Sequence, residues 1–511
     1  MTWRAAVLSA LSTLSTLFAA SALAPKTNWY LQTLDHFDAT DTTRWKHRYL
    51  SSDVYWDGSG RLLNGCKGPV LLYTGNEGPI DAFWDANGFM IDVLAPQFGA
   101  FLLFPEERYY GESLPFGNQT FAAGKPEHLR FLSTAQILAD YAELVDFVKS
   151  STPGMENCPV VAFGGSYGGT LTTLMRLAYP NIVVGGLASS APVGYYDPEG
   201  WDAHGVDEFT WASIVARDYD EAHPRCLATI DAARVAIETA PIDDLVKAFG
   251  VCEPSGLGPN SPSDLFLYVL ESMPQLDYPF AIGSLPAWPV NATCKMLTQV
   301  DASDTQALIS AAAAVVHMLM GAPRATETGC IPTADEGPGG IPGDGPGGIS
   351  AWSFQSCTET LHQFSSKINE NSYQGIRNFH FDMENWVDPI CSKAFNNTVK
   401  PDLHHLAQEF GGYKISDNPE GVTNLIWSNG GMDPWHGGGF YPGDKPGAAG
   451  MEGKSHVQRG SNHYIWIRRG AHHGDLRSSS PEDPEELTSA RALEIEIISG
   501  WIKAAGGVKD S

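Results

Sequence analysis

The chain has 511 residues, enough for one large domain with an insertion or for two domains. With 43% hydrophobic and only 18% charged residues, it has the composition of a packed globular protein, which excludes a disordered chain. Its 32 basic and 59 acidic residues give a net charge of −27, so its electric field would repel nucleic acids and anionic membrane surfaces.

Residues 1–22 are a predicted secretory signal peptide. Arg4 precedes an apolar run of small residues that ends in Ala-Ser-Ala at residues 20–22, the form of a cleavage site. The alternative, a membrane anchor, is disfavoured by the weakly apolar composition of this run. No later run of about 18 uninterrupted apolar residues occurs, so we expect a mature protein without a stable membrane anchor.

Passage through the secretory pathway bears on the cysteines and on three asparagines. The eight cysteines are an even set without CxxC spacing, which favours disulfides over metal ligands. Asn118, Asn291 and Asn396 each begin an Asn-x-Thr triplet and are predicted glycosylation sites. We expect no metal and no cofactor.

Six short apolar runs, each closed by Gly, Pro or polar residues, are the predicted strands of a mainly parallel sheet. They cover residues 68–75, 100–105, 159–164, 182–188, 424–428 and 464–468. Between two of them, residues 137–148 have apolar side chains at helical spacing behind Ser133-x-x-Gln136, a capping-box sequence. This alternation predicts the α/β class.

The middle of the chain, residues 195–405, differs in character. Helical patterns such as residues 230–249 and 304–320 dominate there, and six of the eight cysteines fall within it. We therefore expect a mostly helical insertion held by disulfides, with the Gly/Pro-rich residues 336–348 as a surface loop.

A helix is predicted at the end of the chain. Asp483 is its expected N-cap and Pro484 its first residue, and an apolar face runs from Leu487 to Trp501.

The sharpest chemical signal is Gly164-Gly165-Ser166-Tyr167-Gly168, which lies between a predicted strand and a helical stretch. This is the G-x-S-x-G nucleophile elbow of α/β-hydrolases, in which a strained turn exposes the serine hydroxyl. The alternative is an ordinary Gly-rich turn. In its strand-turn-helix context the motif predicts Ser166 as a nucleophile.

A nucleophilic serine needs a base and a carboxylate, which follow it along the chain in this fold. Asp433 follows the strand at 424–428, and the strand at 464–468 is followed by His472, His473 and Asp475. Both segments reach the carboxyl edge of the sheet, where open α/β sheets build their sites. Spacing leaves Asp433 and Asp475 open as the acid, and His472 and His473 as the base. His404, His405 and His436 lack a matching strand context and are interpreted as structural.

An oxyanion needs two backbone N–H donors. The residue after the nucleophile, Tyr167, supplies one, and the loop at residues 74–78 with Asn76 is the expected source of the other. Cys66 and Cys158 precede the strands that lead to these two loops by similar lengths. If those strands are parallel neighbours, the two cysteines meet and can form a disulfide.

The sequence resembles the proline-directed serine exopeptidases of peptidase family S28, which include Pro-Xaa carboxypeptidase and dipeptidyl peptidase II. Motifs that carry the resemblance run through nearly the whole chain. They are YTGNEG, RYYGESLPFG, FGGSYGG, YPNIVVGGLASSAP, DYPF, LPAWPV, SNGGMDPW, GAHHGDLR and PEDP.

The resemblance implies an α/β-hydrolase sheet, built from residues 23–194 and 406–511, with residues 195–405 as a helical cap. It implies Ser166 as nucleophile, Asp433 as acid, His472 as base and Trp435 in a pocket for the substrate proline. The implied cap disulfides are Cys226–Cys294, Cys252–Cys330 and Cys357–Cys391. Peptides are the implied substrates, and a lysosome, a vacuole or the cell exterior is the implied location.

Three positions depart from the family pattern. Glu107 stands where members usually have His, and Thr170 and His362 stand where members usually have methionines of the pocket. A more polar pocket weakens the apolar packing around a proline ring. The resemblance favours a Pro-Xaa carboxypeptidase slightly, with a dipeptidyl peptidase II-like enzyme as the alternative. A lipase or esterase, or a non-catalytic binding protein, fits less well, and the sequence does not decide between a monomer and a homodimer.

Overall fold

The computed structural model describes residues 23–122, 125–252, 262–323, 329–331, 351–369, 372–395 and 397–507. The predicted signal peptide, Asn396 and the loop at 336–348 lie outside the described residues. Among the helices of the described part, none combines the length and apolar character needed to cross a bilayer.

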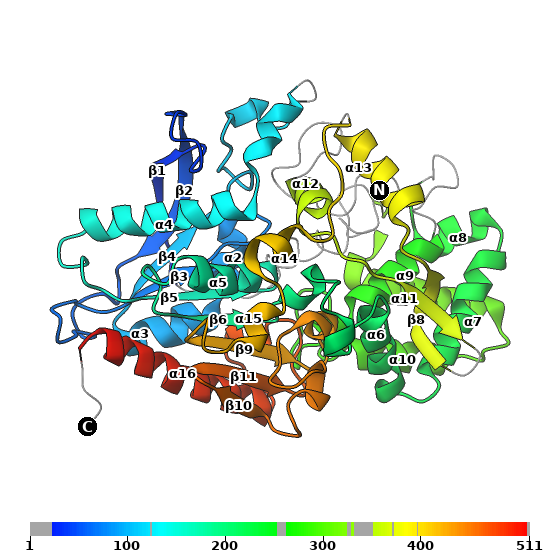
Figure 1. Ribbon diagram of the computed structural model, residues 1–511. Coiled ribbons are helices and arrows are strands. Elements are labelled where there is room, and N and C mark those ends of the chain that lie inside the picture. Colours follow the sequence, from blue (N-terminus) through cyan, green and yellow to red (C-terminus); the bar gives the residue numbers. More distant parts are fainter. Residues whose placement is uncertain are drawn as a thin grey trace.

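The core of the protein is a nine-stranded sheet with the order β1-β2-β4-β3-β5-β6-β9-β11-β10 (Figure 1). All six predicted strands are present, and they pair in parallel with one another, as expected for an α/β-hydrolase. Their bounds are β3 Val70–Tyr73, β4 Phe101–Pro105, β5 Val160–Gly165, β6 Gly185–Ser189, β9 Leu425–Gly430 and β11 Asn462–Ile467.

Three further strands extend the sheet at its edges through antiparallel pairs. These are β1 (Lys26–Thr33), β2 (Arg44–Ser52) and β10 (His456–Arg459). The sequence does not predict them, because edge strands are partly exposed and carry many polar and charged side chains. Their apolar signal is therefore weak.

Helices cover both faces of the sheet and separate two hydrophobic cores. The alternation of side chains along β3 sends Val70 and Leu72 to one face, which α4 (Thr134–Ser151) and α5 (Tyr167–Ala178) cover. Leu71 and Tyr73 point to the other face, which α2 (Ile80–Ala86), α3 (Ala95–Phe98) and α16 (Glu485–Ala505) cover. In Figure 1, α4 and α16 lie on opposite sides of the strands.

Two predicted helix caps need correction. Ser133 accepts a bond from the N–H of Gln136 and caps α4, but the Gln136 side chain does not return the bond. It donates to Asp35 and accepts from the N–H of His36 instead, so the capping box is incomplete.

At α16 the N-cap is Pro484, not Asp483. The buried guanidinium of Arg491 draws the Asp483 carboxylate into an ion pair and away from the helix N–H groups.

Between β6 and β9 the chain leaves the sheet and forms mostly helices, which lie beside the sheet in Figure 1. The predicted helix at 304–320 is α11 (Thr305–Met320). The stretch 230–249 is two helices, because Pro241 cannot continue α7. The helices are α6 Thr210–Ala222, α7 Cys226–Thr239, α8 Ile242–Phe249, α9 Pro262–Ser272, α10 Pro289–Thr298, α11, α12 Ala351–Thr358, α13 Asp388–Ala394, α14 His405–Phe410 and α15 Lys414–Asp417.

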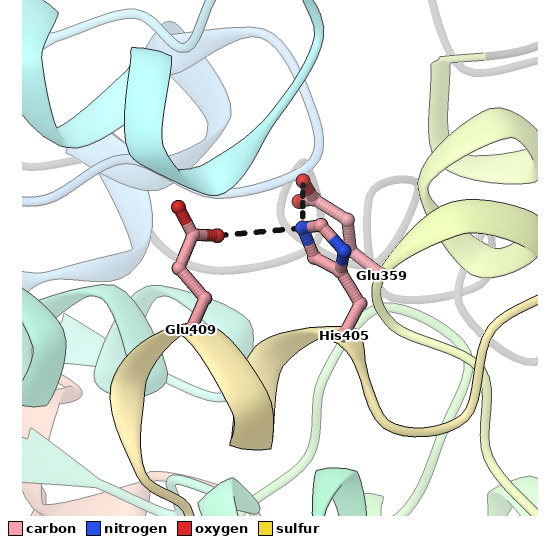
Figure 2. A group of neighbouring side chains, drawn as sticks. All are labelled: Glu359, His405 and Glu409. Carbon is pink, nitrogen blue, oxygen red and sulfur yellow. Dashed lines mark ion pairs between the residues drawn. The ribbon is translucent and has the colours of Figure 1, made fainter.

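A small hairpin in this region was not predicted. Its strands, β7 (Ser366–Asn369) and β8 (Ser372–Phe379), pair antiparallel, and β8 lies against α6. The hairpin sequence is too polar and too short to show an apolar alternation. Glu359, which precedes the hairpin in the chain, follows α12 directly. Its side chain faces α14 (Figure 2).

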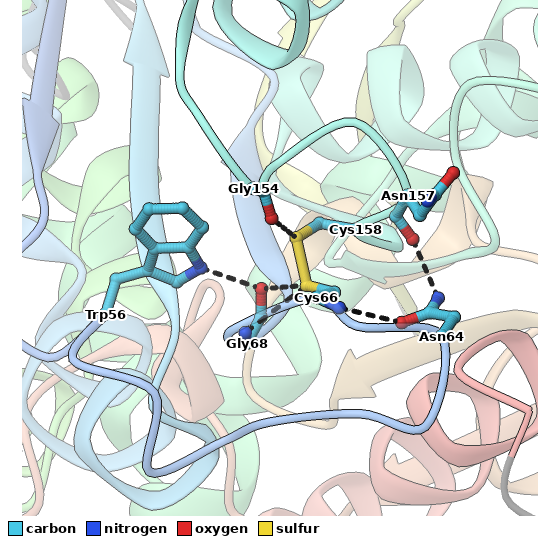
Figure 3. The surroundings of a disulfide bond; sticks show 7 residues. All are labelled: Trp56, Asn64, Cys66, Gly68, Gly154, Asn157 and Cys158. Atoms are coloured by element: carbon cyan, nitrogen blue, oxygen red, sulfur yellow. Dashed lines mark hydrogen bonds between the residues drawn. A yellow bond between two sulfur atoms is a disulfide. The ribbon is translucent and has the colours of Figure 1, made fainter.

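Four disulfides link all eight cysteines of the chain. Cys66 and Cys158 are bonded, because they precede β3 and β5, which are parallel neighbours (Figure 3). The pairs implied by the family resemblance are present too: Cys226–Cys294, Cys252–Cys330 and Cys357–Cys391. Disulfides of this number are typical of chains that fold in an oxidising compartment.

Replacing both Cys66 and Cys158 by Ser should lower the free energy of unfolding by about 2–5 kcal/mol, because the bond spans 92 residues. Urea unfolding measures the loss. The matched control, Ser at Cys357 and Cys391, opens a span of only 34 residues and should lose about 1 kcal/mol less. Wild-type stability in the first variant would contradict the entropic role of this bond.

Candidate active site

Ser166 lies at the sharp turn between β5 and α5. Its φ of 60° and ψ of −128° place a non-glycine residue in a strained backbone conformation, as a nucleophile elbow requires. The turn closes only because Gly164, Gly165 and Gly168 lack side chains. A Cβ on Gly164 would lie 2.1 Å from the carbonyl oxygen of Gly168.

The loop after β3 is fixed against this elbow. Thr74 Oγ1 donates to the carbonyl of Gly168 at 2.7 Å, and Asn76 Nδ2 donates to the carbonyl of Gly165 at 3.0 Å. Tyr167 opens α5, where the first N–H groups have no partner within the helix. The loop that contains Asn76 is therefore bonded to the turn on both sides of Tyr167.

The structure pairs Asp433 with His472. The Oδ2 atom of Asp433 lies 2.8 Å from His472 Nδ1, and both side chains are fully buried. The other carboxylate oxygen of Asp433 accepts the N–H of Trp435 at 3.1 Å, which fixes the carboxylate plane. Nε2 of His472 is buried and has no hydrogen bond to any described residue, Ser166 included.

The competing acid and base occupy other places. Asp475 accepts a hydrogen bond from Ser189 and faces Glu494, whose pKa burial and the Asp475 charge raise well above its usual range. His473 donates its backbone N–H to Ser190 Oγ at 2.8 Å. Burial first, and then the Arg477 charge, hold the pKa of its ring well below the usual value. Neither Asp475 nor His473 joins the Asp433 pair.

His473 nevertheless places the His472 loop beside the elbow. A Cβ built on Gly165 would lie 2.7 Å from Cγ of His473. The segment that carries His472 therefore packs directly on the residue before Ser166.

The inserted region holds His472 from its other side. The backbone N–H of His472 donates to the carbonyl of Gln275 at 3.0 Å, and the Tyr278 hydroxyl donates to the His472 carbonyl at 2.7 Å. Trp435 Nε1 donates to Gln275 Oε1 at 2.9 Å. The sequence analysis missed these roles; the DYPF motif at 277–280 was the one available signal.

Aromatic rings gather around Trp435. His362 is among them, with its ring centre 5.2 Å from that of Trp435, and the His472 ring lies at 6.3 Å. Other rings of the group belong to Tyr195, Trp211 and Phe364. The structure thus brings Trp435 and His362 together. Thr170 lies in the first turn of α5, where its N–H donates to the Ser166 carbonyl, and no described contact joins it to this group.

Two predicted glycosylation sites, Asn118 and Asn291, are exposed.

His436 is buried, and burial together with Arg217 lowers its pKa well below the usual value, which fits a structural residue. Ligand atoms at metal-binding spacing occur in the group Glu359, His405 and Glu409 of the described chain (Figure 2).

Comparison with known proteins identifies the family. The sequence matches the family described as serine carboxypeptidase S28 over residues 32–494. This chain belongs to that family. It is 33% identical to the lysosomal Pro-X carboxypeptidase of Mus musculus, over 93% of this chain and 88% of the mouse protein. The human protein of that name gives the same values, and the prolyl carboxy peptidase like protein 5 of Caenorhabditis elegans is 32% identical over 92% of this chain and 88% of its own length. The protein is thus a serine-type exopeptidase.

This S28 peptidase carries a buried acidic side chain, Glu107, in a hydrogen-bond network next to Tyr167. Glu107 is fully buried, and Gln355 donates to it at 3.2 Å and to the Tyr167 hydroxyl at 2.9 Å. Burial, and then the nearby Glu77 charge, raise the pKa of Glu107 well above its usual range. Glu107 therefore belongs, through Gln355, to a network that ends at Tyr167, the residue after Ser166.

Replacing Glu107 by Gln should stabilise the peptidase more at pH 7.5 than at pH 5. Folded wild type retains a proton that the unfolded chain releases above about pH 4.5, so its stability falls as pH rises. Glutamine has no proton to lose. The gain between the two pH values should be about 1 kcal/mol or more in urea unfolding.

The control for this experiment is Glu156→Gln, which makes the same change of charge at an exposed position. It should follow the pH dependence of the wild type. An identical slope for Glu107→Gln would show that Glu107 is already ionised in the folded protein.

Proposed function

We propose that this protein is a Pro-Xaa carboxypeptidase that uses Ser166, His472 and Asp433 as a catalytic triad. The observation that carries the proposal is the fully buried pair of Asp433 and His472. The loop of His472 packs against the strained Ser166 turn. An acid and a base held beside a serine hydroxyl are the requirements of nucleophilic catalysis.

In this mechanism His472 Nε2 takes the proton of the Ser166 hydroxyl as its oxygen attacks the peptide carbonyl. Asp433 keeps the proton of His472 on Nδ1, so that Nε2 is free to act as the base. In the free enzyme the hydroxyl and Nε2 are not hydrogen bonded, and such bonds commonly form only with substrate bound.

The attack forms a tetrahedral intermediate with a negatively charged oxygen. The backbone N–H groups of Tyr167 and Asn76 are the donors we assign to this oxyanion. His472 then gives its proton to the leaving amine, which departs as the C-terminal amino acid. Water, deprotonated by the same His472, hydrolyses the acyl-enzyme and releases the shortened peptide.

The ring group around Trp435 is the proposed site for the substrate proline. Its rings lie within reach of His472, so an apolar side chain bound there would sit next to the scissile bond. Trp435 and His362 would contact the proline ring. A carboxypeptidase is preferred over a dipeptidyl peptidase because the mouse and human relatives are Pro-X carboxypeptidases.

The proposed location is an acidic compartment reached through the secretory pathway. Four disulfides, a pI near 4.8 and the lysosomal relatives support it.

Matched peptides at about pH 5 test the specificity. An N-terminally blocked peptide with proline before its last residue should lose that single residue, while a peptide with a free N-terminus and proline at its second position should stay intact. Mass spectrometry of the products reads the outcome, and Ser166→Ala is the blank. Release of an N-terminal dipeptide would establish the alternative, and cleavage by Ser166→Ala would refute the mechanism.

Substitution of the two candidate acids separates their roles. Asp433→Asn should lower kcat by about 10³–10⁴-fold, because the amide favours the wrong tautomer of His472. Asp475→Asn makes the same chemical change at a carboxylate that does not bond His472, and its kcat should stay within about tenfold of wild type. The reverse ranking would move the acid to Asp475.

A further inference from the structure

Outside the catalytic pair, three side chains bring ligand atoms of metal-binding type together. His405 and Glu409 are four residues apart on α14, and Glu359 follows α12 (Figure 2). Nε2 of His405 lies 3.4 Å from an oxygen of Glu359 and 3.3 Å from an oxygen of Glu409. In Figure 2 both carboxylates point toward the same ring nitrogen.

These separations are longer than the usual charge-assisted hydrogen bond, although the two carboxylates raise the pKa of His405 to about 10 and form ion pairs with it in the free protein. Such hydrogen bonds have N to O distances of about 2.7–2.9 Å. Ligands about 2.0–2.1 Å from a tetrahedral Zn²⁺ lie about 3.4 Å from one another, which is the observed spacing around His405. One ligand atom from each of the three residues lies within 4.8 Å of the others.

Hydrogen bonds from Thr134 hold Glu359 in place, as the residues around a metal site hold its ligands. Its second oxygen accepts both the backbone N–H and the hydroxyl of Thr134 at 2.8 Å, which leaves the first oxygen facing His405. The Glu359 side chain is only 4% exposed. Hydrogen bonds of this kind fix the orientation of a ligand before the metal arrives.

The other side of the group is open to solvent. The side chains of His405 and Glu409 are 42% and 36% exposed, so an ion has an entry path and a water molecule can complete its coordination. A helical pair at i and i+4 is also a common chelate for zinc.

We propose that Glu359, His405 and Glu409 bind a divalent transition-metal ion of the zinc type, with water as the fourth ligand. The ion would link α14 to the segment after α12 and to Thr134 at the start of α4. Its expected effect is stabilisation of this junction. The site is independent of the proposed triad, since none of its ligands contacts Ser166, Asp433 or His472 through a described hydrogen bond.

Sequence reasoning predicts no metal here because the ligands come from separate segments. His405 and Glu409 alone form an ordinary exposed helical pair, and only the fold adds Glu359.

Zinc titration of the full, disulfide-bonded protein tests the proposal. The protein is stripped with EDTA, dialysed and titrated with ZnCl₂ by calorimetry at about pH 8. Zinc must displace a proton from His405 there, because the two carboxylates raise the pKa of that ring to about 10. Wild type should show one binding site that the double variant His405→Gln, Glu409→Gln lacks. His404→Gln is the matched control, since it removes the adjacent, similarly exposed imidazole and should retain the site.

Thermal unfolding supplies a second readout. Free zinc at about 100 times Kd should raise the unfolding temperature of wild type and His404→Gln by about 3 °C and leave the double variant unchanged. If the double variant does not fold, Glu409→Gln alone, at a partly exposed position, should weaken zinc binding by at least about tenfold.

Co²⁺ gives a spectroscopic check, because its visible absorption distinguishes a tetrahedral from an octahedral site. Equal zinc stoichiometry in wild type and double variant would overturn the proposal. A double variant that loses stability without any difference in zinc binding would show an ion pair only, and would overturn it as well. Peptidase activity does not enter either test, so failure of the metal site and failure of the proposed function are distinguishable.

Discussion

The close approach of the first turn of α5 to the ends of β3 and β5 is the constraint on which the rest of the site depends. The approach is possible only with hydrogen in place of a side chain at Gly164 and Gly168. It leaves Ser166 in a strained backbone conformation. Such a conformation persists only when several surrounding contacts hold the residue in place. Thr74 and Asn76 provide that support by bonding to the carbonyls of the turn.

The same principle of support from several segments applies to the base. His472 comes from the loop after β11, its acid Asp433 from the loop after β9, and its backbone partners from the inserted helices. Because Gln275 bonds both the His472 backbone and the Trp435 side chain, the insertion positions the base and the aromatic group as one unit. A change in the packing of the insertion is therefore expected to affect catalysis as well as substrate fit.

The close packing around the Ser166 turn buries acidic side chains. Glu77 and Glu107 lie close to the turn and form no ion pair with a described residue, and burial raises the pKa of both. Keeping such groups protonated is less costly in an acidic compartment than at neutral pH, because the unfolded chain then holds its protons too. The strongly negative net charge points the same way.

The sequence by itself determined the six parallel strands of the sheet, the order of Ser166, Asp433 and His472 along the chain, and the family. These features depend on local apolar runs and on motifs whose residues are adjacent, such as Gly164 to Gly168. The Cys66–Cys158 bond could also be inferred from the sequence. Parallel neighbouring strands place residues at equal distances before them side by side.

Spacing alone left open which carboxylate and which imidazole pair, since Asp433 and Asp475 both follow strands that end at the same edge. The family resemblance implied Asp433 and His472, and the tertiary structure shows these two side chains in contact. It alone revealed Gln275 and Tyr278 behind His472, the polar edge strands, and the meeting of Glu359 with His405. Each of these depends on contacts between segments far apart in the chain, and no local pattern of residue types encodes the direction in which a side chain is held.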